Sequence, residues 1–361
     1  MDKKIKVALV GAGKIAEVHL EAYKKVSDME VVAICDINEE TLNKTADEFG
    51  IKRRYTSLED MLANEKELDA ADVCVWNCSH AQCTIAALNA GLHVLCEKPM
   101  AFSAKEAEEM KATAAKNDRL LMVGFVSRFT KGATIVKDFI DNDYLGEVYY
   151  AKAQYVRRHG NPGGWFSDKA RSGGGPLIDI GVHAIDRARW LMGSHKPVSV
   201  YAATFDKLGG RWAELKNAVG WRPDDATDND ICDVEDFATA LIRFDNGAVL
   251  QIEASYDVNL PETSGIVLCG DKGGMKESDE APIFYTNVNG HLAEVNVSSN
   301  DYKTEKGMFN EEVFVTEMQH FADCILGRCE CMTTAEDGVI IMKILDAIYE
   351  SARTGHEIII K

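Results

Sequence analysis

The stretch that decides the fold is IKVALVGAGKIAEVHLEAY, residues 5–23, near the start of the chain. The apolar residues Ile5–Val10 predict a β-strand, and the amphipathic run that begins at Lys14 predicts a helix. The turn between them, GAGKIA at residues 11–16, has the form G-x-G-x-x-A. Gly11 permits a tight turn and Gly13 lets backbone amides approach a pyrophosphate at the helix N-terminus. Strand, turn and helix together predict a dinucleotide-binding unit.

A carboxylate ends the second predicted strand, Val31–Cys35, at Asp36. Asp36 lies 36 − 13 = 23 residues after Gly13, close to the spacing of about 20 found in dinucleotide-binding domains. It can accept both ribose hydroxyls of NAD and would repel a 2′-phosphate, so NAD is the expected cofactor and NADP the less favoured one. The alternative is that Asp36 only caps the helix that starts near Asn38. The residues expected to bind the cofactor here are Gly11, Gly13, Lys14, Ile15 and Asp36.

Strand-like and helix-like segments alternate up to about residue 125, which predicts parallel strands joined by helical crossovers. The further expected strands are 73–75, 93–96 and 120–123, and the further helices are 39–49, 82–90 and 104–117. We therefore expect an α/β Rossmann domain over residues 1–125.

Strands with period-two alternation dominate after residue 145, and Asp245-Asn246-Gly247 between two of them is a strong hairpin signal. Strands are expected at 147–156, 197–204, 237–244, 248–256, 265–269, 282–286 and 293–297, and helices at 177–191, 311–326 and 335–354. This pattern predicts an α+β domain over residues 126–361, with a largely antiparallel open sheet that serves substrate binding and oligomerisation. Its last helix could pack back on the Rossmann domain.

The charge balance of 40 Lys plus Arg against 58 Asp plus Glu gives −18, which argues against nucleic acid and anionic membranes as partners. We see no signal peptide and no apolar stretch of membrane length, so a cytoplasmic protein is expected. Its ten cysteines are then expected to be reduced thiols. Cys74, Cys78 and Cys83 have no second close pair or histidine motif beside them, so no metal site is expected.

Two positively charged side chains follow predicted parallel strands. Lys98, in the turn Glu97-Lys98-Pro99, comes directly after strand 93–96, and Arg128 follows strand 120–123. Ligands of open α/β sheets bind beyond the carboxyl ends of the strands, so both side chains are expected in the cofactor crevice. The alternative for Lys98 is an ordinary exposed turn.

A second polar cluster lies in GGGPLIDIGVHAID, residues 173–186. If the segment is helical from residue 177, Asp179 and His183 lie four apart on one face, with Asp186 close to it. A histidine beside a carboxylate can act as a general base, although such a pair is often only a surface hydrogen bond. The three glycines before it indicate close approach of the backbone to another group.

The turn at residues 11–16, Asp36, the Glu97-Lys98-Pro99 turn and the 173–186 block together resemble the Gfo/Idh/MocA family, named for glucose–fructose oxidoreductase and inositol dehydrogenase. The resemblance spans nearly the whole chain, including residues 351–355 in the last helix. It implies hydride transfer between a nicotinamide cofactor and a secondary hydroxyl of a sugar, glycoside or polyol. It also implies a homo-oligomer, a dimer or a tetramer.

The resemblance implies roles for particular residues. Lys98 would hydrogen-bond the reacting oxygen, His183 would exchange the hydroxyl proton, and Asp179 would tune this site and contact substrate. Such an arrangement is chemically coherent, because an ammonium stabilises the negative charge that develops on oxygen. Trp165 resembles a family aromatic near the nicotinamide, with core packing against Phe166 as the alternative.

One departure from the family concerns VWNCSH at residues 75–80, where members often have Thr-Pro-Asn-x-x-His. Asn77 and His80 keep their register, so contacts near the ribose are expected to survive, and Glu97 is expected to border the cofactor too. Trp76 replaces the proline, and we favour packing for it over a cofactor contact.

Substrate recognition is expected from Arg157, in the segment 155–166 that leads into the glycine block. The loop 206–230, with Trp212 and Trp221, is expected to form a rim or a subunit contact, or else an ordinary surface excursion. Two other functions stay open: a glycosidase that recycles tightly held NAD, and a non-enzymatic sugar or NAD sensor. The joint presence of Lys98, Asp179 and His183 favours the dehydrogenase.

Overall fold

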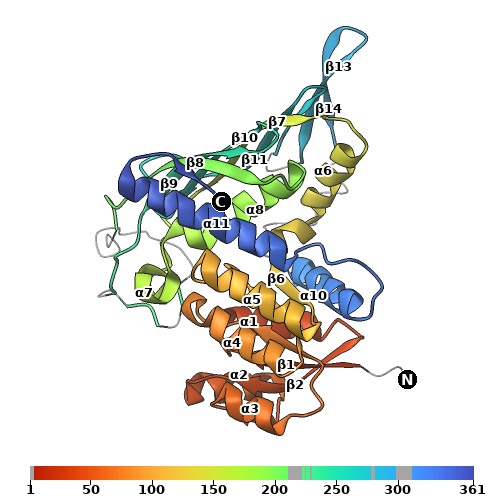
Figure 1. The fold of residues 1–361 in the computed structure, drawn as a ribbon, viewed down its shortest axis with the longest axis vertical. Helices are drawn as coiled ribbons and strands as arrows, with labels where there is room; N and C mark the ends of the chain where they lie inside the picture. Colours follow the sequence, from red (N-terminus) through yellow and green to blue (C-terminus); the bar gives the residue numbers. More distant parts are fainter. Residues whose placement is uncertain (1–3, 210–221, 224, 228–229, 278–280, 298–310) are drawn as a thin grey trace. The chain divides into compact units, whose positions relative to one another are not determined.

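The computed structural model describes residues 4–209, 222–223, 225–227, 230–277, 281–297 and 311–361 (Figure 1). Trp212 and Trp221 of the predicted rim lie outside these residues. The chain forms two compact units, each built from two separate stretches. The first unit contains residues 1–129 and 309–342, and the second contains residues 130–308 and 343–361.

The first unit is built on a six-stranded parallel sheet with the order β3-β2-β1-β4-β5-β6. Its strands are β1 (Ile5–Val10), β2 (Met29–Cys35), β3 (Arg53–Tyr55), β4 (Ala70–Val73), β5 (His93–Glu97) and β6 (Leu121–Gly124). The strand order reverses between β1 and β4, and an open α/β sheet binds its ligand at such a point. The glycine turn that follows β1 lies there.

Right-handed crossovers place α1 and α2 on one face of this sheet and α3, α4 and α5 on the other. The helices are α1 (Lys14–Tyr23), α2 (Glu39–Phe49), α3 (Leu58–Asn64), α4 (His80–Asn89) and α5 (Ala104–Asn117). Serine or asparagine side chains cap three of them, at Asn38 for α2, Ser57 for α3 and Ser103 for α5.

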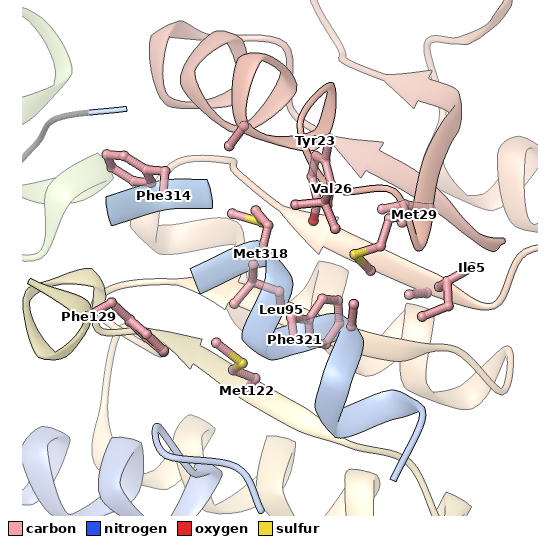
Figure 2. Close-up of a cluster of buried hydrophobic side chains, with 14 of the residues drawn as sticks. Ile5, Tyr23, Val26, Met29, Leu95, Met122, Phe129, Phe314, Met318 and Phe321 are labelled. Carbon is pink, nitrogen blue, oxygen red and sulfur yellow. The ribbon is translucent and has the colours of Figure 1, made fainter. Parts of the chain in front are cut away.

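Helix α10 (Glu311–Ile325) completes the core of the first unit from near the end of the chain. It packs on α1, and Figure 2 shows Phe314, Met318 and Phe321 of α10 in one apolar cluster with Tyr23 and Met122. All five side chains are buried. Complete burial of one such side chain contributes roughly 1.5 to 3 kcal/mol, so this late segment is integral to the unit.

The second unit is built on a nine-stranded sheet with the order β14-β13-β12-β11-β7-β10-β9-β8-β15. Its strands are β7 (Val148–Val156), β8 (Pro197–Phe205), β9 (Phe237–Phe244), β10 (Val249–Ser255), β11 (Thr263–Gly270), β12 (Gly274–Lys276), β13 (Ile283–Val288), β14 (His291–Asn296) and β15 (Ile358–Ile359). Strands β7 and β10 pair in parallel and the other pairs are antiparallel. The predicted fold class is confirmed by both sheets.

In the described part of the second unit the helices are α6 (Lys131–Asp141), α7 (Lys169–Ser172), α8 (Val182–Leu191) and the second half of α11 (Ala335–Thr354). Helix α8 packs on β7 and β10. The hairpin predicted at residues 245–247 joins β9 to β10, with Gly247 in the left-handed region at φ +87°. The cross-strand pair Tyr201 and Leu241 is exposed on one sheet face, and the implied oligomer stays a prediction.

The elements that were not predicted include β3, α3 and α6, and the short α7 and β12. The three residues of β3 include two arginines, Arg53 and Arg54, so the strand carries no apolar run that periodicity could detect. Helix α3 spans less than two turns and α6 follows the Rossmann domain directly, where no turn signal separates it from β6.

Candidate functional site

The two glycines of the turn after β1 have different surroundings. Packing within the protein excludes a side chain at Gly11, whereas Gly13 faces open space. Gly11 has φ +99°, and a side chain there would overlap the carbonyl of Cys74 at the end of β4. Gly13 precedes α1 with φ −76°, and a Cβ at this position would meet nothing within 4 Å. The space in front of Gly13 is therefore available to a ligand at the N-terminus of α1, where backbone N–H groups favour a negative charge.

Asp36 is held against this turn by its own hydrogen bonds. Its Oδ2 accepts the Ala12 amide at 2.8 Å, and its Oδ1 accepts the Asn38 amide at 2.7 Å. The cap of α2 is Asn38, whose side chain accepts the amides of Glu40 and Thr41, so the helix does not need Asp36 as its cap. A carboxylate has about four acceptor positions, which leaves room for two ribose hydroxyls. These residues fit a dinucleotide.

Lys14 and Ile15 can offer a cofactor mainly their backbone, because their side chains are engaged elsewhere. The ammonium of Lys14 pairs with Glu17 at 2.8 Å on the exposed side of α1. The side chain of Ile15 packs against the core, so any contact of Ile15 with a cofactor would come from its main chain.

The turn that carries Lys98 is held by two buried side chains. Glu97 Oε2 accepts the amide of Lys98 at 3.1 Å, and the Lys98–Pro99 peptide bond is cis. His80 lies with Nδ1 2.7 Å from the carbonyl of Pro99 and Nε2 3.0 Å from the carbonyl of Val75. Both ring nitrogens thus face the main chain, and His80 ties the loop after β4 to the lysine turn.

The neighbouring Asn77 is 5% exposed, and Trp76 is 39% exposed. The ribose contact of Asn77 and the packing role of Trp76 stay predictions.

A cluster of buried ionisable side chains lies next to the lysine turn. His19 on α1 lies 2.8 Å from Asp72 through Nδ1 and 3.1 Å from Glu97 through Nε2. Burial would lower the pKa of His19, but Cys74 and Asp72 outweigh burial and raise it well above its ordinary value. Burial would raise the pKa of Glu97, but the hydrogen bond and charge of His19 lower it overall. The imidazolium is thus stabilised between two carboxylates.

Glu317 of α10 adds an acid to this cluster. It is fully buried, and neither carboxyl oxygen has a hydrogen-bond partner in the part of the chain that the structure describes. Burial, and then the charge of Glu97, raise the pKa of Glu317 well above its ordinary value, which favours the neutral acid. Sequence reasoning missed this cluster because its members come from positions 19, 72, 97 and 317.

In the second unit, Asp179 lies in a π-helical turn, Leu177–Gly181, that runs into α8. The hydroxyl of Tyr256 donates to Asp179 Oδ2 at 2.9 Å. Burial, followed by the charge of Asp179, raises the pKa of Tyr256 well above its usual range, so this hydroxyl keeps its proton and remains a donor. His183 lies in the first turn of α8 and is 2% exposed. Such π turns occur frequently at functional sites.

Arg157, just after β7, lies near this group. Its guanidinium donates to the carbonyl of Gly160 at 3.2 Å and lies over the ring of Tyr155 at 5.3 Å. Burial would lower the pKa of Arg157, but Tyr155 and the Asp179 carboxylate raise it overall. The second unit therefore brings together Arg157, Asp179 and Tyr256, of which sequence reasoning missed the tyrosine.

The three glycines before Asp179 are required by the protein itself. A side chain at Gly174 would overlap the hydroxyl of Tyr349, and one at Gly175 would overlap the carbonyl of Glu235. The Glu235 carboxylate accepts the amides of Gly175 at 3.0 Å and Leu177 at 3.2 Å, and so caps the π turn. The close approach that the sequence indicated is thus to Glu235 and Tyr349, neither of which was predicted.

Arg128, which was expected in the cofactor crevice to bind substrate, has partners within the first unit. It is 1% exposed, and its guanidinium donates to the carbonyl of Met332 at 2.6 Å and to Asp337 at 3.2 Å within the first unit. A buried cation with these partners joins the start of α11 to the end of β6, and the contact of Arg128 with a substrate stays a prediction. Trp165, in the second unit, lies half-buried with its ring 3.9 Å from that of Phe166, and its nicotinamide contact stays a prediction.

None of the helices in the described ranges is both long enough and apolar enough to span a membrane. The glycine turn, the anchored Asp36 and the parallel sheet define a nucleotide-binding Rossmann domain. A family model described as "Oxidoreductase family, NAD-binding Rossmann fold" matches residues 5–125, and its companion, "Oxidoreductase family, C-terminal alpha/beta domain", matches residues 137–360. The chain belongs to the Gfo/Idh/MocA family, which confirms the resemblance found in the sequence.

Similar proteins include D-glucoside 3-dehydrogenase of Escherichia coli (strain K12), which is 34% identical over 97% of this chain and 96% of its own length. D-xylose 1-dehydrogenase (NADP(+)) 2 of Haloferax volcanii is 28% identical over 92% of each chain. The solved structure of levoglucosan dehydrogenase in complex with NADH covers 99% of this chain and 100% of its own, with a TM-score of 0.83 and 22% identity. At that identity the structural likeness concerns the fold.

Proposed function

We propose that this chain oxidises a secondary hydroxyl of a sugar, glycoside or polyol, with NAD as the hydride acceptor. The observation that carries the proposal is the group in the second unit, where the buried Tyr256 hydroxyl holds Asp179 and Arg157 lies near. Such a set of acceptors and donors suits the many hydroxyls of a carbohydrate. The likeness to a glucoside dehydrogenase over nearly the whole chain supports the same substrate class.

The proposal gives three residues a role in the reaction. His183 takes the proton of the reacting hydroxyl, and Asp179 orients the substrate and favours the protonated form of the histidine. Lys98 donates a hydrogen bond to the same oxygen and stabilises the negative charge that develops on it. When bound, the nicotinamide supplies the acceptor for the hydride that leaves carbon.

We propose NAD over NADP because Asp36 is fixed at the glycine turn. Its two hydrogen bonds to backbone amides hold the carboxylate at the turn, and the 2′-phosphate of an NADP bound there would meet a like charge. The exposed side chain of Ile37, beside it, offers an apolar surface to the adenine. The family contains a relative whose name specifies NADP(+), so this preference must be measured on this chain.

The experiment is to follow nicotinamide absorbance with purified protein, NAD and a panel of D-glucosides, free sugars, levoglucosan and inositols. We expect reduction of NAD with one of these classes, with glucosides the first to test, followed by identification of the oxidised carbon. A cofactor that stays bound while glycosides are cleaved would instead indicate the NAD-recycling glycosidase. Ligand binding without any turnover would indicate a sensor, and either result would overturn the proposal.

A further inference from the structure

Three thiols and one imidazole converge where α10 ends in the first unit. His320 and Cys324 lie one turn apart on α10, and Cys329 and Cys331 follow in the segment that leads to α11. The ligand atoms of His320, Cys324 and Cys331 all lie within 4.8 Å of one another. The sulfur of Cys329 lies 3.6 Å from that of Cys324 and 3.6 Å from Nδ1 of His320. Residues separated by up to eleven positions thus form one compact group.

The spacing within this group resembles the edges of a zinc tetrahedron. With Zn–S bonds of about 2.3 Å and Zn–N bonds of about 2.0 Å, sulfurs lie about 3.8 Å apart and sulfur lies about 3.5 Å from nitrogen. The Cys324–Cys329 sulfur pair is at 3.6 Å, and Cys324 Sγ lies 3.4 Å from His320 Nε2. Tetrahedral coordination by three sulfurs and one nitrogen is typical of structural zinc.

The fold brings the chain back over Cys324 by a turn at Gly327. Gly327 adopts φ +69°, which ends α10 and reverses the direction of the chain. The carbonyl of Thr333 then accepts the amide of Val123, so the returning segment pairs with the edge of the parallel sheet at β6. This backbone pairing fixes the positions of Cys329 and Cys331 relative to α10.

Packing also fixes the imidazole and the last thiol. The ring of His320 lies 5.3 Å from that of Phe129, and Cys331 packs against the apolar cluster that Figure 2 shows. The amide of Met332 donates to His320 Nε2 at 2.9 Å. A metal bound at Nε2 would replace this donor, and the amide would then be close enough to donate to a metal-bound thiolate, a common outer contact of metal sites.

We propose that His320, Cys324, Cys329 and Cys331 bind one structural Zn²⁺ ion. All four positions of the tetrahedron would be protein ligands, which leaves none open for water or substrate and makes the site structural. The exposed Cys329 would complete the site by a side-chain rotation toward Nε2, since its sulfur now lies beside Cys324 and the Nδ1 atom of His320, outside the set that includes Cys331. The ion would fasten the α10–α11 connection to the edge of the sheet.

The test is metal analysis of the untagged full-length protein, purified without chelator. We expect about one zinc ion per chain. Replacement of Zn²⁺ by Co²⁺ should give the intense visible absorption of tetrahedral thiolate cobalt. Cys324→Ser and Cys329→Ser should lose most of the zinc, whereas Cys269→Ser, in β11 of the second unit, should retain it.

Thermal unfolding provides a second measurement if a variant of a buried cysteine folds poorly. A strong chelator should lower the Tm of the native protein but not that of Cys329→Ser, because this variant has no zinc to lose. Cys329 is exposed, so its substitution should not itself disturb folding. Native protein that contains no zinc and gains no stability from added Zn²⁺ would overturn the proposal. So would a mass about 2 Da below the reduced value, since that would assign Cys324 and Cys329 to a disulfide.

Discussion

The glycine turn of the first unit and the Asp179 group of the second unit are built by different means. The turn is made of backbone groups and one carboxylate, all within residues 11–38, and the Ala12 amide meets Asp36 directly. The Asp179 group joins side chains from positions 157, 179 and 256. A backbone site of this kind can bind a cofactor shared by many enzymes, whereas a side-chain site can change its substrate by substitution of single residues.

The two regions also differ in what supports them. Beneath the lysine turn, His19, Glu97 and Glu317 form a buried ionisable cluster, whereas the π turn is capped by Glu235 through backbone amides. The first support depends on protonation, so its stability should vary with pH.

The largest effect is expected from His183→Asn and Lys98→Met. Loss of the proton acceptor or of the donor to the reacting oxygen should lower turnover by about 100-fold or more, because general acid–base groups contribute that much. NAD affinity, measured by quenching of protein fluorescence, should change little. His291→Asn and Lys105→Met remove exposed residues of the same types and serve as controls. If NAD affinity fell in proportion to turnover, both residues would act in cofactor binding and not in the reaction at the substrate hydroxyl.

The next effect concerns the backbone site. Asp36→Asn keeps one acceptor oxygen but removes the charge that would repel a 2′-phosphate. The preference for NAD over NADP, measured as a ratio of kcat/KM values, should fall by about tenfold to 100-fold, as expected for the loss of a close charge–charge repulsion. Glu39→Gln removes an exposed charge from the first turn of α2 and controls for general electrostatics. An unchanged ratio would exclude Asp36 from the ribose position.

A smaller effect is expected in the side-chain site from Tyr256→Phe. The variant removes the hydroxyl that donates to Asp179, and a hydrogen bond to a charged group is worth about 1.5 kcal/mol or more, so kcat/KM should fall about tenfold. Tyr150→Phe removes a hydroxyl that donates to Gln251 in the same sheet and should leave kcat/KM unchanged. Equal losses in the two variants would mean that Tyr256 only stabilises the sheet.

The smallest effect is expected from Glu317→Gln and concerns stability. Because the folded protein raises the pKa of Glu317, it retains a proton that the unfolded chain has released above about pH 4.5. The free energy of unfolding therefore falls as pH rises from this ordinary value toward the folded pKa, and glutamine abolishes that loss. The Tm difference, variant minus native, should grow by a few degrees from pH 5 to pH 8.

The exposed Glu312→Gln variant on the same helix should follow the native curve. Parallel curves for Glu317→Gln and the native protein would show that the cluster does not depend on this acid.

Much of the first region could be predicted because its determinants are local. A glycine turn between a strand and a helix, with an acid at the end of the next strand, specifies the backbone geometry within about 30 residues. Tyr256 and Glu235 carry no such pattern, because their partners lie 77 and 58 residues away. Their role depends on the register of the second sheet, which periodicity alone does not determine.

Two other positions show the same limit. Arg128 follows a parallel strand, as a ligand-binding residue often does, but its partners Met332 and Asp337 lie 204 and 209 residues later in the chain. The sequence did not predict a site at Cys324, Cys329 and Cys331, because a His-x₃-Cys pair on a helix followed by Cys-x-Cys is not a common zinc spacing. Only the reversal at Gly327 brings them together.

The late position of α10 has a consequence for synthesis on the ribosome. The first unit is interrupted from residue 130 to residue 308, so 308 − 129 = 179 residues must be translated before the segment begins that carries Phe314, Met318 and Phe321, which cover the apolar side of α1. At ordinary elongation rates this interval is roughly 10 to 40 s. During that time a nascent Rossmann sheet would present an uncovered hydrophobic surface, which is the kind of surface that chaperones bind. A fragment that stops at residue 129 should therefore aggregate rather than fold.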